Sequence, residues 1–127
     1  MGEIKLLVDT DILIDFINRR AYRTYLDNPR VSVYYSIVTK KEILSKRGLK
    51  DSERRAILTL LQRFRLIRVD RRIAGEYSRL RSMYHALEQG DALIAASALV
   101  RRLPLLTRNR RHFRVIRELA LLPVDIG

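Results

Sequence analysis

Cysteine and tryptophan are absent from the 127 residues, and histidine is rare, with only His85 and His112. Without cysteine the chain forms no disulfide framework and no zinc site built on thiolates. Acidic residues are also scarce: 14 Asp and Glu stand against 26 Lys and Arg, which gives a formal net charge of +12. Most of these cations are arginine, whose guanidinium matches phosphate geometry. Composition therefore favours a nucleic-acid partner over the alternative that the charge serves solubility or thermal adaptation.

Long hydrophobic runs are missing as well. No apolar stretch approaches the roughly 18 residues that span a bilayer. Asp9, Asp11 and Asp15 interrupt the opening MGEIKLLVDTDILIDF, so it is not a secretory signal peptide. We therefore expect no membrane association and a cytoplasmic location. With 47% hydrophobic residues, residues 1–127 are expected to form one globular domain.

Short apolar runs alternate with helical patterns along the chain. This alternation predicts an α/β fold with a central, mostly parallel four- or five-stranded sheet flanked by helices. The last long helix is apolar on nearly every side, which predicts that it is buried. We expect strands at residues 4–9, 31–36, 66–70 and 104–107, a short fifth strand within 121–126, and helices at 10–18, 37–48, 51–64, 71–89 and 92–100.

Local signals set several of these boundaries. Thr10 is a candidate cap of the first helix, and either Asp51 or Ser52 caps the third. Gly48 is expected to close the second helix, since glycine favours the conformation that ends helices. Gly90 is expected to separate the last two long helices.

Four oxygen-bearing side chains fall where one site can collect them. Asp9 ends the first strand and Asn109 follows the strand at 104–107, so both can face the crevice beyond the carboxyl ends of parallel strands. Asp91 opens the buried helix, and Glu42 borders the apolar side of the helix after the second strand. Taken singly, Asp91 suits a helix cap, Glu42 a solvated helix residue and Asn109 a turn.

Asp9 is harder to explain by structure alone. A carboxylate at the end of a buried strand needs a partner, yet a second carboxylate, Asp11, follows within two residues. Clustered carboxylates raise one another's proton affinity unless a cation is present, and hard oxygen ligands suit Mg²⁺ or Mn²⁺. Such an ion activates water and stabilises the charge on a phosphodiester under attack. The hypothesis is metal-dependent phosphodiester cleavage, with nearby arginines holding the substrate.

Four segments resemble the motifs of PIN-domain ribonucleases, in the same order. The opening signature is matched by LLVDTDILIDF, the segment bearing a glutamate by SIVTKKEIL, the third acidic motif by GDALIAASAL and the fourth by LLTRNRRHF. Each motif is weak alone, but together they span nearly the whole chain. Within the family, the chain is most similar to VapC toxins.

The resemblance implies an endonuclease that cuts single-stranded RNA, requires Mg²⁺ or Mn²⁺, forms a homodimer and is held inactive by a VapB-type antitoxin. It implies that Asp9, Glu42 and Asp91 bind the metal. Asn109 stands at the fourth position, where many relatives carry Asp, so either one ion is held more weakly or Asn109 positions water or substrate. Asp11 stands where relatives often have Asn, and its charge partly compensates.

Other residues of the motifs have supporting roles in this hypothesis. Thr10 matches a small hydroxyl residue that can orient Asp9 or a metal-bound water, while His112 and Phe113 match an HF pair that we interpret as structural. His85 is interpreted as a surface or packing residue within its helix. The expected substrate-binding residues are Lys41, Arg108, Arg110 and Arg111.

Tyrosines offer a further hypothesis. Tyr22, Tyr25, Tyr34 and Tyr35 are candidates for stacking on unpaired bases, against the alternative that they are core or dimer contacts. Neighbouring strand residues point to opposite faces, so at most one of Tyr34 and Tyr35 faces a groove.

Two other enzyme families share part of the pattern. VDTDIL resembles the opening of haloacid-dehalogenase-type phosphatases, and Asp9, Asp11 and Asp70 would suit a phosphorylated receiver domain. Both families need a downstream lysine, but no lysine follows Lys50, and residues 92–117 lack the late acids of the phosphatases. An RNA-processing PIN nuclease outside a toxin system and a non-catalytic basic RNA-binding protein stay open as alternatives.

Overall fold

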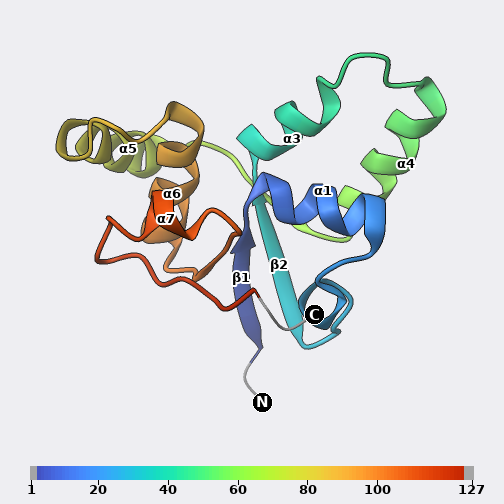
Figure 1. Cartoon of the computed structure of the whole chain (residues 1–127), viewed down its shortest axis with the longest axis horizontal. Helices are drawn as coiled ribbons and strands as arrows, with labels where there is room; N and C mark the ends of the chain where they lie inside the picture. The colour runs from blue at the N-terminus through green and yellow to red at the C-terminus, as the bar shows by residue number, and fades with distance from the viewer. Residues whose placement is uncertain (1–2, 125–127) are drawn as a thin grey trace.

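The computed structural model describes residues 3–124 as a parallel sheet between two groups of helices (Figure 1). The strands are β1 (Ile4–Val8), β2 (Val31–Ser36), β3 (Arg65–Ile67) and β4 (Leu105–Leu106), in the order β3-β2-β1-β4. All three strand pairs are parallel, which confirms the predicted fold class. The helices are α1 (Thr10–Arg19), α2 (Arg23–Leu26), α3 (Ile37–Leu44), α4 (Asp51–Leu61), α5 (Arg71–Met83), α6 (Gln89–Arg101) and α7 (Arg110–Phe113).

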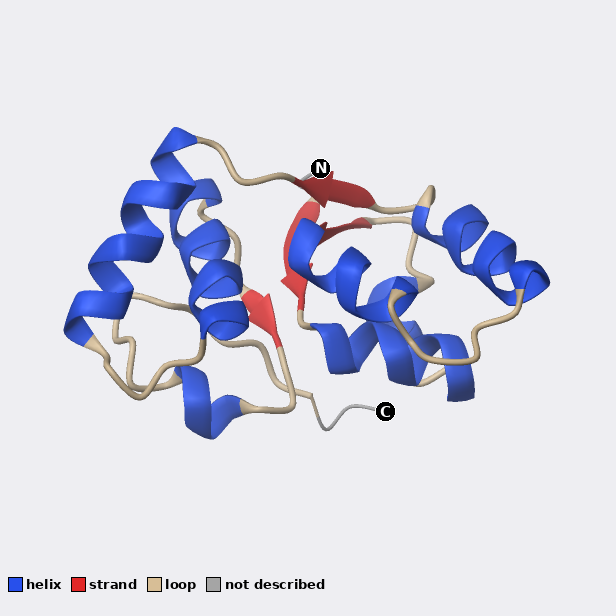
Figure 2. Ribbon diagram, turned by 90° about the horizontal axis from the view of Figure 1, so that it is seen from above, coloured by secondary structure: helices blue, strands red, loops and turns tan. Residues whose placement is uncertain are grey.

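β1 divides the core in two because its side chains alternate between the faces of the sheet. Leu6 and Val8 pack into a cluster with residues of α1, α3 and α4. Leu7 packs into the other cluster, with residues of α5, α6 and α7. Figure 2 shows these helices on the two sides of the strands. The predicted burial of α6 is confirmed, since Ala92 and every residue from 94 to 98 are buried.

The strand order determines where the crevice lies. β1 lies between β2 and β4, so the chain leaves it toward one side and returns on the other. In parallel sheets this reversal opens a crevice at the carboxyl ends of the two strands on either side of it, here β1 and β4. Asp9 follows β1 directly, and residues 107–109 follow β4, so both segments lie at this opening.

Several predicted helix ends were wrong. α3 ends at Leu44, and Gly48 lies in the loop beyond it with φ of 76°, which glycine adopts without steric cost. α5 ends at Met83, so residues 84–88 form a loop rather than its last turns. Gly90 lies inside the first turn of α6, where a Cβ would be 3.7 Å from Val38 Cγ1 on α3.

The predicted caps were also wrong. Asp9, not Thr10, caps α1, because its carboxylate accepts a hydrogen bond from the Thr10 backbone N–H at 2.8 Å. α4 already includes Asp51, and at its start the Glu53 carboxylate accepts from the Lys50 backbone N–H at 3.0 Å.

Three strands are shorter than predicted: β1 ends at Val8 instead of Asp9, and β3 and β4 are reduced to Arg65–Ile67 and Leu105–Leu106. The predicted fifth strand is reduced, in the part of the chain that the structure describes, to a bridge between Leu121 and Leu105. Its end at 125–126 lies outside the described residues. The short helices α2 and α7 were not predicted, since four residues are too few to show a helical period.

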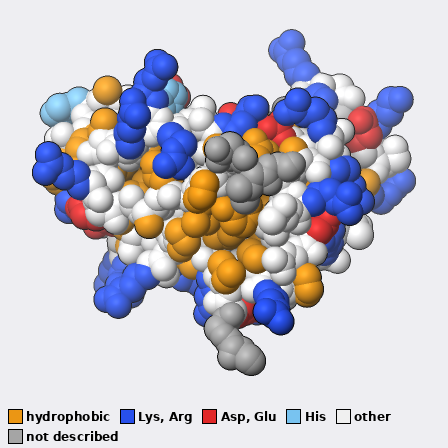
Figure 3. Space-filling model, turned by 60° about the horizontal axis from the view of Figure 1, so that its bottom comes forward, with side chains coloured by type: hydrophobic (Ala, Val, Ile, Leu, Met, Phe, Trp, Pro, Cys, Tyr) orange, Lys and Arg blue, Asp and Glu red, His pale blue; other side chains and the backbone are white. Residues whose placement is uncertain are grey.

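Positive charge is spread over the surface. On the face seen in Figure 3, Lys and Arg side chains lie around the edge and hydrophobic side chains gather in the middle. No helix within residues 3–124 is both long enough and apolar enough to cross a membrane.

Candidate active site

Asp9 is fixed at the end of β1. Its backbone N–H still donates to Leu106 O of β4, at 2.9 Å. Its carboxylate, on a residue that is 4% exposed, accepts from the Thr10 backbone N–H at 2.8 Å and from Thr107 Oγ1 at 2.7 Å. Burial raises the pKa of the Asp9 carboxyl, and Asp11 raises it further, although the two hydrogen bonds oppose this shift. The Asp9 carboxylate is therefore held in one orientation, and its ionised form is destabilised unless a cation lies nearby.

Glu42 reaches the same place from α3. Thr10 Oγ1 donates to Glu42 Oε1 at 3.2 Å and lies 2.9 Å from Thr39 Oγ1. Because Thr10 has one hydroxyl proton, which goes to Glu42, the buried Thr39 hydroxyl is the donor in the second bond. Burial raises the pKa of Glu42, and the charges of Asp9, Asp11 and Asp91 raise it further. The hydroxyl of Thr10 thus contacts Glu42, whereas its backbone N–H contacts Asp9.

Asp91 enters from the other side of the crevice. It is the third residue of α6, whose N-cap is Glu88, so the alternative that Asp91 caps the helix was wrong. Burial and the nearby Asp9 raise the pKa of the Asp91 carboxyl, while His112 opposes the shift. His112 Nδ1 lies 3.4 Å from Asp91 Oδ2. The imidazole is therefore a direct neighbour of an acid in the crevice, which the structural interpretation of His112 missed.

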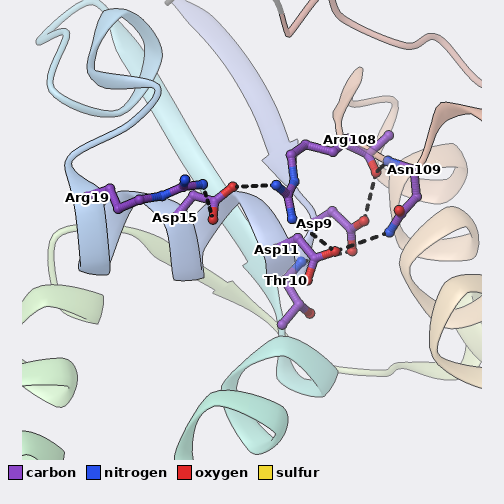
Figure 4. Close-up of polar contacts among 8 residues, drawn as sticks. Asp9, Thr10, Asp11, Asp15, Arg19, Arg108 and Asn109 are labelled. Carbon is purple, nitrogen blue, oxygen red and sulfur yellow. Dashed lines mark hydrogen bonds and ion pairs between the residues drawn. The ribbon is translucent and has the colours of Figure 1, made fainter.

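Asn109 and Arg108 lie over the start of α1 (Figure 4). The Asn109 backbone N–H donates to Thr107 Oγ1 at 2.9 Å, and its Nδ2 donates to Asp11 Oδ2 at 3.4 Å. The guanidinium of Arg108 lies between two carboxylates, 3.1 Å from Asp15 Oδ2 and 3.7 Å from Asp11 Oδ2. A cation of the chain is thus held beside the acids.

A family model described as the PIN domain matches residues 6–119. The chain belongs to the PIN-domain family. Ribonuclease VapC10 of Mycobacterium tuberculosis is 35% identical over 121 residues, 90% of each chain. Ribonuclease VapC1 of Methanocaldococcus jannaschii is 28% identical over 124 residues, 94% of this chain and 86% of that one. A toxin-antitoxin complex from Klebsiella pneumoniae contains a similar chain, with 32% identity, a TM-score of 0.74 and coverage of 91% of this chain and 95% of that chain.

These similarities confirm the resemblance to VapC proteins that the four motifs indicated. They do not assign a role to any single residue of the site. That geometry brings Asp9, Glu42 and Asp91 within range of one another's charge, with Asn109 beside Asp9 and Asp11.

The donor set of this PIN domain suits a hard cation. Within residues 3–124 no three His, Asp or Glu side chains are close enough to form a compact ligand group. Mg²⁺ does not need one, since it usually keeps several waters and is held by one or two carboxylates together with substrate phosphates. Burial is the main cause of the raised pKa values of Asp9, Glu42 and Asp91, and neighbouring acids raise them further, so a bound cation would stabilise the ionised carboxylates.

The four expected substrate-binding residues differ in where they point. Arg108 lies in the crevice, and Arg111 lines a hollow next to Asp91. Arg110 points elsewhere, since its Nη1 donates to Leu122 O at 2.7 Å. Lys41 is exposed on α3, but neighbouring helix residues do not share a face, so it does not point with Glu42.

The four tyrosines that were candidates for base stacking are all at least partly buried. Tyr34 and Tyr35 are buried on opposite faces of the sheet, so neither stacks on RNA and the alternative of core contacts holds. Tyr22 and Tyr25 are partly buried against the same cluster as Tyr35. Phe113 is fully buried, as its structural role requires.

The predictions from sequence missed or misplaced several other residues near the site. Thr39 and Thr107 are hydrogen-bonded supports of the acids, and Asp15 holds Arg108. The available signal for Thr107 was its place as the last residue of the strand predicted at 104–107. His85 is exposed, as expected, but it lies in the loop after α5 rather than within a helix.

Proposed function

We propose that this protein is a metal-dependent endoribonuclease that cleaves single-stranded RNA and acts as the toxin of a toxin-antitoxin pair. The observation that carries the proposal is that Thr10 joins buried Asp9 and Glu42 at the reversal point of a parallel sheet, with Asp91 near enough for the charges to act on one another. The names of the relatives, both Ribonuclease VapC, support the same chemistry.

The proposed cofactor is Mg²⁺ or Mn²⁺, with Asp9, Glu42 and Asp91 as its ligands, directly or through waters that the ion keeps. When bound, such an ion supplies an activated water and positive charge against the phosphate. Asp9 is the least mobile of these ligands because two hydrogen bonds already orient its carboxylate. Thr10 orients Glu42 in the same way. Preorganised ligands lower the reorganisation that the reaction requires.

Asn109 brings a neutral amide to the proposed active site. Its Nδ2 donates to Asp11, which leaves the amide oxygen to accept from a water or to contact the cation. In this proposal Asn109 aligns water or substrate, while Asp11 restores part of the negative charge that an acid at position 109 would supply.

Arg108 and Arg111 are the proposed phosphate contacts. Asp15 holds Arg108 at 3.1 Å, so the guanidinium stays beside Asp11 and is available for a phosphate that enters the crevice. Arginine suits this task because its planar fork binds two phosphate oxygens at once. Lys41 adds positive charge near α3. The net charge of +12 attracts RNA from a distance.

A VapB-type antitoxin is the proposed partner, and a homodimer the proposed assembly, with the cytoplasm as the location. An apolar groove of about 460 Å³ between α1, α3 and α4 supports the first of these. It is lined by Ile14, Ile17, Ile43 and Ile57 and extends to Glu42. A peptide seated there would meet a proposed metal ligand and would thereby block the site. The Klebsiella relative was solved as a toxin-antitoxin complex.

The test is cleavage of single-stranded RNA with Mg²⁺, with Mn²⁺ and with EDTA. Wild type should cut with either metal, and Asp9→Asn and Asp91→Asn should bind RNA without cutting it. Asp51→Asn, an exposed acid on α4, is the matched control and should cut normally. Equal cutting by all variants, or cutting in EDTA, would remove the basis of the proposal. Binding without cutting by the wild type would favour the non-catalytic alternative.

A further inference from the structure

A hollow of about 400 Å³ lies beside Asp91, outside the group of acids at the end of β1. One wall is the loop at 84–88, and the other comes from α7 and the residues after it. Its volume falls within the range of sites that bind small molecules or single nucleotides. The hollow is apolar at Leu87 and Val115 and polar where Glu88 and Arg111 reach it.

Both walls are anchored to the core. Leu87 is 5% exposed and Tyr84 packs against the core cluster of α5 and α6, which fixes the loop. Phe113 is fully buried, so its neighbour His112 is presented outward on α7. Val115, 52% exposed, lines the hollow on the side of α7. These core contacts fix the positions of both walls and therefore the shape of the hollow.

We propose that this hollow binds one nucleobase of the RNA, next to the phosphate that is cut, and that Glu88 selects guanine. The inference rests on the proposed nuclease function. Because the hollow shares Asp91 with the acidic site, a nucleotide whose phosphate reaches the cation brings a base of the same strand to the hollow.

The side chains around the hollow match the chemistry of a base. Unpaired bases are recognised by stacking on aromatic rings and by hydrogen bonds along their Watson–Crick edge, and Tyr84 and His112 supply the rings. The Glu88 carboxylate can only accept hydrogen bonds. Guanine presents two adjacent donors, N1–H and N2–H, to one carboxylate, whereas the other bases do not. Arg111 supplies a cation for the phosphate of the same nucleotide.

The first test maps cut sites on a pool of random single-stranded RNA. Wild type should show guanine enriched at one fixed position beside the cut. Glu88→Gln should lower that enrichment about tenfold, since a good bidentate contact to a base discriminates by this order. Glu118→Gln, an exposed acid outside the hollow, should keep it. A wild type without base preference, or a Glu88→Gln variant that keeps it, would overturn the inference while leaving the nuclease intact.

The second test needs no cleavage. Binding of GMP, AMP, CMP and UMP to the full chain in EDTA is followed by NMR. GMP should perturb the Tyr84 and His112 resonances at the lowest concentration, and Glu88→Gln should weaken GMP about tenfold without weakening AMP. If GMP binds in the hollow and no RNA is cut under any condition, guanine binding there is supported and the nuclease proposal is refuted. Equal binding of all four nucleotides, or binding elsewhere, refutes the proposed guanine site.

Discussion

The two sides of the crevice are built in different ways. On the side of β1 and α1, Asp9 and Thr10 are 4% and 6% exposed, and their side chains take part in hydrogen bonds of 2.7 to 3.2 Å. On the side of α6 and α7, the Asp91 side chain is 21% exposed and its partner His112, at 3.4 Å, is 55% exposed. Buried, satisfied networks are rigid, whereas exposed pairs rearrange at low cost. The first side suits a fixed metal ligand, and the second combines the metal ligand Asp91 with exposed residues that can adjust to a substrate.

Asp9→Asn should have the largest effect. The amide keeps the size of the side chain but removes the charge at the rigid side, so RNA cleavage should fall by more than about 100-fold, since loss of outer supports alone costs about 10- to 100-fold. The metal-free thermal midpoint should stay equal or rise, because a buried charge is removed. A variant that retains activity would show that the buried side is not the reactive one.

Thr107→Val should come next. It removes the hydroxyl that donates to Asp9 Oδ2 and accepts from the Asn109 backbone N–H. Cleavage should fall by about 10- to 100-fold, as for other supports of metal ligands. Thr107→Ser restores the hydroxyl and should recover most of the rate. If valine and serine behave alike in a cleavage assay, the hydrogen bond has no role in positioning Asp9.

The rigid side was only partly predictable from sequence. The apolar run of β1 and the rule that crevices open at strand ends placed Asp9 and the segment at 107–109 together. Thr107 could not be assigned, because its bond to Asp9 joins residues 98 positions apart. Thr39 was missed for the same reason, since its partner Thr10 lies 29 positions away. Hydroxyl residues carry no pattern that identifies a distant partner.

The open side was predicted less well. α5 was extended to residue 89 because apolar residues continue at helical spacing, but Tyr84 leaves the helical conformation at φ −125° and ψ 82°. Gly90 was taken as a break, yet it lies in the first turn of α6, where a glycine is easily accommodated. With those two errors the loop at 84–88, and therefore the hollow, was hidden inside a predicted helix.

Asn109→Asp sharpens the comparison by adding a charge between the two sides. A fourth carboxylate should tighten Mn²⁺ binding by about tenfold, because divalent affinity rises with the number of charged ligands. The metal concentration for half-maximal RNA cleavage should fall accordingly. Asn109→Ser, which adds no charge, is the control. An Asp variant with unchanged metal dependence would mean that position 109 does not face the cation.

His112→Ala tests the open side and should act more weakly. Loss of the exposed imidazole should raise KM by about fivefold through weaker base stacking, the lower end of the about 1–3 kcal/mol that stacking contributes per base, because Tyr84 remains. It should lower kcat less than Thr107→Val does, since His112 contacts Asp91 from an exposed position whereas Thr107 bonds to Asp9 from a buried one. Steady-state cleavage of a short RNA separates the two constants. A large loss in kcat with constant KM would assign His112 to the reaction itself.

The smallest effect concerns pH and stability. In the metal-free fold the pKa of the Asp9 carboxyl lies above its ordinary value of 3.8, so the folded state holds the proton more tightly than the unfolded state. Wild type therefore loses stability as pH rises from about 3.8 through the raised pKa. Asp9→Asn lacks this loss, and its thermal midpoint in EDTA should increase relative to wild type over that range. A difference that is constant with pH would contradict the raised pKa.

Binding of Mn²⁺ tests the central claim most directly. Calorimetric titration of wild type, Asp9→Asn, Asp91→Asn and the double variant asks whether the two sides of the crevice hold one ion. We predict that each single change weakens the same binding event and that their effects are not additive, as for residues that share one ligand. Unchanged affinity in both single variants, or two independent sites that each variant removes separately, would contradict the account.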